Sequence, residues 1–202
     1  MAQRTDTPGT PKPSGRRQFP DNPDFLNDRL ILDSNVFIDF AKAPDEVLSK
    51  VGGRSIHHTK DIQLELAAYY EDPVYPLVGS EKTADSMLDD FGSTLLPATD
   101  GMKKIAEPIS EHLLLSGVQS EQVRAAEKDI RIVSCGIAHQ ADIASADKLF
   151  YVIGEIFKTN IRIILLSDPP QEWVANAEKA LKNQGVSTPV DIPGIALNQD
   201  SS

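Results

Sequence analysis

Two short, strongly apolar runs constrain the fold of this chain more than any other feature of its sequence. The first is Leu30-Ile31-Leu32, and the second is IRIILL, which begins at Ile161. Runs that are apolar on both faces of a strand are typical of parallel sheets covered by helices on both sides. The segments between the runs have helical periodicity, and alternation of strands with helices predicts the same layers. We therefore predict a three-layer α/β/α fold around a central parallel sheet.

The remaining elements follow from the spacing of apolar residues and from turn-forming residues. We expect further strands at SIHHT (55–59) and IASA (143–146), and helices at 36–41, from 45 to the Gly52-Gly53 turn, and at 60–70, 120–141, 148–158 and 169–184. The segment 73–118 carries two apolar stripes at helical spacing. We expect it to form a helical cap on the domain.

Length and composition predict one domain with tails. A chain of 202 residues, 40% of them hydrophobic, can bury one sizeable core but is short for two complete domains. Residues 1–28 mix Pro, Gly, Ser and basic residues without periodicity, which indicates a disordered basic arm. The folded domain is then 29–186, and 187–202 is a tail. A single cysteine and the lack of a long apolar stretch favour a cytoplasmic protein without membrane insertion.

Four carboxylates lie where an acid on a solvated surface would not be expected. Asp33 directly follows the first apolar run and Asp147 follows IASA, so both lie at the carboxyl ends of strands, where parallel sheets bind ligands. Glu65 and Asp129 fall on or beside the apolar stripes of two predicted helices. Like charges that converge repel one another and imply a cation, and an all-oxygen ligand set favours Mg²⁺ or Mn²⁺.

Three of these acids also have an ordinary structural role open to them. Asp33 could cap the helix that follows it, and Glu65 and Asp129 could each pair with a basic neighbour. Asp142 is a rival for Asp129, but it precedes the last motif and lies outside the helical stripe. The order and spacing of the four acids together carry more weight than any one of them.

At this point the chain resembles the PIN-domain family. The stretch LILDSNVFIDF, with Asp33 and Asn35 after an apolar strand, is similar to the family's opening motif. Glu65 is similar to the family's second acid. The family's third motif is resembled by DIRIVSCGIA, which begins at Asp129, and its last motif by Ser145-Ala146-Asp147. The resemblance covers roughly residues 29 to 170, with a longer segment between the second and third acids than the smallest PIN toxins have.

This resemblance implies metal-dependent hydrolysis of phosphodiester bonds, most often in single-stranded RNA. Asp33, Asp129 and Asp147 would hold Mg²⁺ or Mn²⁺, with Glu65 as a further ligand, while Asn35 would orient Asp33 and Ser145 would orient Asp147. An antitoxin-like inhibitory partner and a homodimer stay open. The net charge of −10 weighs against a polyanionic partner, unless it reflects acids that hold cations.

Two other functions compete with this one. A phosphatase of the haloacid dehalogenase type would use Asp33, but Asn35 replaces the second aspartate of its motif. The chain after Ser167 is also too short to hold the lysine and the paired aspartates that such a phosphatase needs. A PIN-like scaffold without catalysis is the second competitor, although all four acids are present. We expect structural roles for the adjacent His57 and His58, helix packing for Cys135, and core positions for Trp173 and Phe150, rather than base stacking.

Overall fold

A five-stranded parallel sheet forms the centre of the molecule. The computed structural model describes residues 17–71, 83–117, 120–193 and 195. The sheet contains β1 (Arg29–Leu32), β2 (Ser55–His58), β3 (Thr94–Leu95), β4 (Ala141–Ser145) and β6 (Ile163–Leu165), in the order β3-β2-β1-β4-β6. Every neighbouring pair is parallel. The central strands β1 and β4 therefore end side by side, with Leu32 opposite Ala144.

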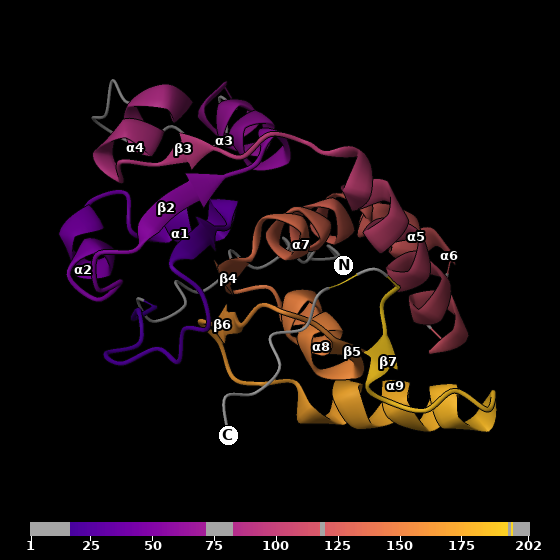
Figure 1. Cartoon of the computed structure of the whole chain (residues 1–202). Coiled ribbons are helices and arrows are strands. Elements are labelled where there is room, and N and C mark those ends of the chain that lie inside the picture. The colour runs from indigo at the N-terminus through magenta and orange to yellow at the C-terminus, as the bar shows by residue number, and fades with distance from the viewer. Residues whose placement is uncertain (1–16, 72–82, 118–119, 194, 196–202) are drawn as a thin grey trace, which may run out of the picture.

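Helices cover this sheet on both sides (Figure 1). They are α1 (Ser34–Asp39), α2 (Pro44–Leu48), α3 (Lys60–Glu71), α4 (Ala84–Asp90), α5 (Asp100–Leu115), α6 (Ser120–Ala125), α7 (Glu127–His139), α8 (Lys148–Ile156) and α9 (Gln171–Asn183). Helix α3 packs on α1 and α4, while α7 packs on α5 and α8, and α8 packs on α9. The three-layer α/β/α fold around a central parallel sheet, predicted from the sequence, is confirmed (Figure 1).

The apolar runs bury as their composition dictates. Leu30, Ile31 and Leu32 of β1 are fully buried, and the whole of β4 is buried. Strands β1 and β4 are therefore covered on both of their faces, as expected for the central strands of a parallel sheet inside an α/β protein. Among the described residues, no helix is both long and apolar enough to cross a bilayer.

Three elements differ from the sequence prediction. The helix expected over 120–141 is interrupted at Ala126, a turn residue between α6 and α7. The expected helical cap at 73–118 contains α4 and α5, but also β3, which adds an edge strand to the sheet. Residues 72–82 of this segment lie outside the described part. A small second sheet pairs β5 (Phe157–Lys158) with β7 (Val190–Asp191).

The ends of the domain extend beyond the predicted boundaries of 29 and 186. Phe19 is buried in the core, and Lys50 Nζ donates to its carbonyl oxygen at 2.7 Å. The guanidinium of Arg54 lies 4.2 Å from the centre of the Phe25 ring. At the other end, Val190 and Ile192 are buried. These isolated anchors have no periodic pattern, so the sequence does not distinguish them from a tail. Residues 1–16, 194 and 196–202 lie outside the described part.

Candidate functional site

Asp33 lies at the carboxyl end of β1 with its carboxylate almost fully buried, at 3% exposure. It caps α1 by accepting from the backbone N–H of Ser34 at 2.8 Å, and it also accepts from Ser145 Oγ at 2.8 Å and from the amide of Asn35. Burial raises the pKa of Asp33, and the hydrogen bonds from Ser145 and Ser34 only partly offset this. Asp33 therefore caps α1 and, at the same time, contacts the end of β4 at the candidate site.

The last residues of β4 fix the geometry around Asp33. Asn35 accepts from the backbone N–H of Ala146 at 3.0 Å while its amide donates to Asp33, so it links the two strand ends. Ser145 Oγ accepts from the backbone N–H of Asp147 at 2.9 Å. Asn35 thus contacts Asp33 in the way the sequence predicts, whereas Ser145 contacts the carboxylate of Asp33 and only the backbone of Asp147.

Glu65 approaches Asp33 from α3 but is shared with other partners. Its carboxylate accepts from Ser34 Oγ at 2.7 Å and from Lys128 Nζ at 2.7 Å. The same ammonium lies 3.7 Å from Asp129. Burial lowers the pKa of Lys128, but its contacts with Glu65 and Asp129 outweigh this and raise it. The site therefore contains a cation supplied by the chain itself.

Asp129 carries the clearest electrostatic sign of a cluster. Its side chain is only 13% exposed at the start of α7. Burial raises its pKa to about 6, against the influence of Lys128, and the charges of Asp147, Asp33 and Glu65 raise it further. Four acids from distant parts of the sequence thus act on one another. Asp147 is the most exposed of them, and it caps α8 by accepting from the backbone N–H of Leu149 at 2.8 Å.

The donor atoms suit a hard divalent cation, although the side chains are not arranged around one. Among the described residues, no group of three or more His, Cys, Asp or Glu side chains is spaced to hold a metal ion. Glu65 is directed at Lys128, and Asp147 at its own helix. Carboxylate oxygens are the ligands that Mg²⁺ and Mn²⁺ prefer, and a cation would oppose the burial and the neighbouring charges that together raise the pKa of Asp129. The residues fit such an ion in the kind of donor atom they offer.

Asp142 has a structural role at the opposite edge of the sheet. It is fully buried near the start of β4. One carboxylate oxygen accepts from the backbone N–H groups of Leu26 and Asn27, at 2.7 and 2.9 Å, and the other accepts from the Asn27 amide and the Arg162 N–H, both at 2.8 Å. These bonds tie the segment before β1 to the sheet. Asp142 is therefore not a member of the acid cluster.

Two side chains in this region were missed by the sequence reasoning. Lys128 is the residue before Asp129, and its reach to Glu65 depends on how α3 and α7 pack. Trp173 was predicted to be in the core but is 56% exposed. Its sequence position contains a usable signal, because the buried stripe of α9 is Val174, Ala177 and Leu181, which leaves Trp173 outside it. Phe150, in contrast, is fully buried as predicted.

His57, His58 and Cys135 have contacts that fit the structural roles predicted for them. His57 contacts the hydroxyls of Ser55 and Thr94, at 2.9 and 2.8 Å, and His58 contacts the Ser93 hydroxyl at 2.9 Å. Cys135 is buried in α7, and burial raises the pKa of its thiol to about 11. A thiol with that pKa is not a ready nucleophile.

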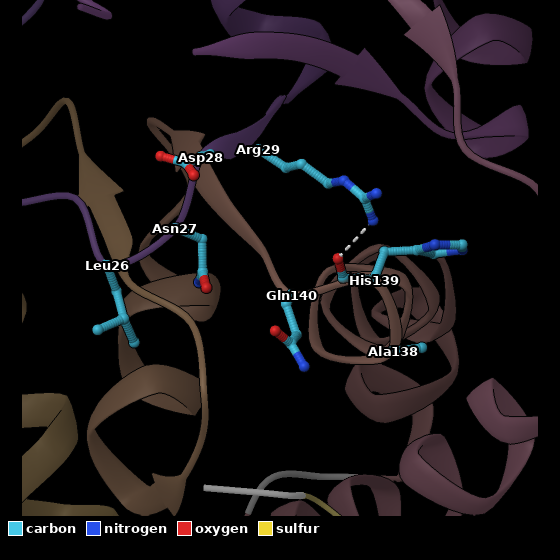
Figure 2. Close-up of a pocket in the computed structure, with 7 residues that line it drawn as sticks. All are labelled: Leu26, Asn27, Asp28, Arg29, Ala138, His139 and Gln140. Carbon is cyan, nitrogen blue, oxygen red and sulfur yellow. Dashed lines mark hydrogen bonds between the residues drawn. The ribbon is translucent and has the colours of Figure 1, made fainter. Parts of the chain in front are cut away.

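A cavity of about 510 Å³ lies at the amino end of the sheet, away from the acid cluster. Figure 2 shows Arg29 extending across it to the carbonyl oxygen of His139, at 3.1 Å. Asn27 and Gln140 are also among its lining residues, and Asp28 is the one carboxylate among them. Because a lone acid is insufficient for a metal centre, we place the candidate site at the carboxyl edge.

Comparison with known proteins gives a distant structural likeness. No protein family model matches the chain, and no curated protein matches it. Among solved structures, the crystal structure of VapBC2 from Rickettsia felis, bound to a DNA fragment from the promoter, is similar with a TM-score of 0.47 and 19% sequence identity. The match covers 66% of this chain and 96% of that one.

Proposed function

We propose that this PIN-like chain is a metal-dependent nuclease that hydrolyses phosphodiester bonds, with single-stranded RNA as its substrate. The observation that carries the proposal is the way the four acids meet at one end of the sheet. Ser34 donates to both Asp33 and Glu65. Glu65 and Asp129 lie 2.7 and 3.7 Å from the same Lys128 ammonium, and Asp129 and Asp147 line one cavity. The raised pKa of Asp129, which arises mainly from burial, agrees with this arrangement. A protein that gathers four acids at the carboxyl edge of a parallel sheet places them where such folds bind ligands. The repulsion between them is a cost that a bound cation would remove.

The acids have different parts in this mechanism. Asp33, held by Asn35 and Ser145, is the fixed ligand, and Asp129 and Asp147 approach it from α7 and from the end of β4. Glu65 joins them as a further ligand or accepts a proton from water. A divalent ion held there would neutralise phosphate charge and supply a more acidic water, so the chain needs no histidine base.

Lys128 would affect how the site binds both a metal ion and the substrate. Its ammonium neutralises part of the acidic charge through its contacts with Glu65 and Asp129. A metal that took Glu65 as a ligand would displace this ammonium, which could then contact a phosphate oxygen. The same lysine thus balances charge in the metal-free protein and assists substrate binding in the loaded one.

The phosphatase alternative has less support than the nuclease. Ser167, its required hydroxyl after the last strand, donates to the Ala146 carbonyl oxygen at 3.2 Å. The Asn35 side chain links the end of β1 to the end of β4, because it donates to Asp33 and accepts from the backbone N–H of Ala146. The scaffold alternative is separated from the nuclease by the experiment below.

The test is a cleavage assay with matched variants. Purified protein is incubated with labelled single-stranded RNA, single-stranded DNA and p-nitrophenyl phosphate, each in Mg²⁺, Mn²⁺ or EDTA. We expect metal-dependent cleavage of RNA, and a loss of at least about a hundredfold in Asp33→Asn. Asp28→Asn, which changes an exposed acid at the opposite edge, is the control and should cleave normally. Metal-independent cleavage, or an equal loss in both variants, would contradict the proposal.

A further inference from the structure

Trp173 is a large aromatic side chain left in solvent at 56% exposure. Helix α9 buries its apolar stripe, including Val174 and Ala177, without it. An indole ring is costly to leave in water, and exposed aromatic rings beside clefts commonly contact ligands. Trp173 is also the only tryptophan of the chain.

The Trp173 ring shares a cavity with two acids of the candidate site. The cavity has a volume of about 550 Å³, within the usual range for small-ligand sites, and is lined by Trp173, Asp129 and Asp147 together with the apolar side chains of Leu149 and Val152. It is therefore continuous with the acid cluster. One wall is apolar and aromatic, and the other is the place where a phosphate would meet metal.

Lys148 supplies a positive charge beside the Trp173 ring. It follows Asp147 in the chain, and its Nζ lies 5.9 Å from the centre of the Trp173 ring. A flat π surface, an ammonium group and carboxylates suited to a metal ion are thus found within one small region. These are the groups that contact the base and the phosphates of a nucleotide.

We infer that this cavity is a subsite for one unstacked nucleobase, which stacks on Trp173 while the neighbouring phosphate lies at Lys148 and the acid cluster. This inference rests on the proposed nuclease function and gives its substrate class a structural reason. A base in a duplex is already stacked and paired, so only a single strand can present a free base to the ring. Stacking is tolerant of sequence, because every base has a π face. The subsite therefore selects strand state rather than sequence.

The fluorescence of the single tryptophan tests this directly. We use the full chain with Asp33→Asn, which prevents cleavage, and titrate it in Mg²⁺ and in EDTA with a short oligouridylate, with an abasic ribose-phosphate oligomer of equal length, and with an RNA duplex. We expect the oligouridylate to quench the Trp173 fluorescence, while the abasic oligomer and the duplex cause little change. An equal response to the abasic oligomer would overturn the inference.

Affinity variants give a second measurement, by anisotropy of a labelled oligouridylate. Trp173→Ala should weaken binding by about tenfold, and Trp173→Phe should recover most of the loss, since a phenyl ring also stacks. Lys148→Met should flatten the salt dependence of binding. Leu64→Ala is the matched control, because Leu64 is equally exposed at 57% but lies on α3. Unchanged affinity in Trp173→Ala would overturn the inference.

The two proposals fail in different ways. Cleavage of RNA by the wild type, with normal binding in Trp173→Ala, would keep the nuclease and remove the subsite. Base-dependent quenching without cleavage in any metal would keep the subsite and remove the nuclease. Quenching by an apolar peptide and not by RNA would assign the cavity to a protein partner and overturn the inference.

Discussion

At the scale of single residues, Asp129 gives a dependence of stability on pH. Its pKa is about 6 in the folded protein and 3.8 as a reference for the unfolded chain. Between about pH 4 and 6 the folded state therefore binds a proton that the unfolded state does not, and the free energy of unfolding falls as pH rises through this range. The penalty at neutral pH is at most about 3 kcal/mol.

Asp129→Asn removes this penalty. In EDTA at pH 7.5 the variant should melt at a higher temperature than the wild type, and near pH 4.5 the difference should shrink to about a third of its value at pH 7.5. The variant should also lose most of the stabilisation that Mn²⁺ gives the wild type. Thermal melts at both pH values, with and without Mn²⁺, measure this, and a full Mn²⁺ response in the variant would remove Asp129 from the site.

Asp142 provides the opposite case among the buried acids. Its two oxygens accept from Leu26, Asn27 and Arg162. In Asp142→Asn an NH₂ group would face these donors, so we expect a loss of at least about 3 kcal/mol in unfolding free energy by urea denaturation. The Mn²⁺-induced rise in melting temperature should persist. A stable variant that lost the metal response would place Asp142 in the site.

Sequence reasoning located the four acids because each breaks a local apolar pattern. Asp33 ends an apolar run, and Asp129 borders a helical stripe, so the anomaly is visible without coordinates. The direction of each side chain is not visible, because it depends on partners from other elements. Glu65 turns to Ser34 and Lys128, and no periodicity encodes that choice.

At the scale of elements, two ion pairs join α3 to α7. Arg131 Nη2 lies 2.6 Å from Asp61, and Lys128 Nζ lies 2.7 Å from Glu65. Both pairs connect the same two helices, but only the second touches the acid cluster. The pairs can therefore be separated by mutation.

Lys128→Met removes the ammonium that competes with a metal ion. In EDTA the variant should melt at a lower temperature, because Glu65 and Asp129 lose their counter-charge. Half-maximal stabilisation should then occur at a severalfold lower Mn²⁺ concentration than in the wild type. Arg131→Met is the control, which should lower the melting temperature without changing the Mn²⁺ concentration required. Weaker Mn²⁺ binding in Lys128→Met would show that Lys128 supports the metal site instead.

The long helices and fully apolar strands were predictable, and the two-residue strands were not. Periodicity needs several turns or alternations to be visible, and β3, β5 and β7 each have two residues. The break at Ala126 also has no sequence signal, since neither Gly nor Pro marks it. Contacts between elements position such features instead: α6 packs on α5 and α7, β3 on β2, and β5 on β7.

At the scale of the whole molecule, the segment before β1 is part of the folded domain. Phe19 is 1% exposed, and its ring meets that of Phe40 edge to face, with centroids 6.3 Å apart. The segment then continues to Asn27, whose backbone N–H donates to Asp142 near the start of β4. Packing of this segment stabilises the edge of the sheet opposite the acid cluster.

Phe19→Ala tests whether this segment stabilises the domain without forming the site. The substitution removes a fully buried ring, so we expect the free energy of unfolding to fall by about 3 to 5 kcal/mol in urea denaturation. Asp21→Ala is the control on the same segment, because the Asp21 side chain is 87% exposed and ion pairs of exposed carboxylates contribute little. The Mn²⁺ concentration for half-maximal stabilisation should be unchanged in both variants, since the acids lie at the other edge. An unchanged stability in Phe19→Ala would restore the domain boundary at residue 29, and a loss of Mn²⁺ response would show that the two edges of the sheet are coupled.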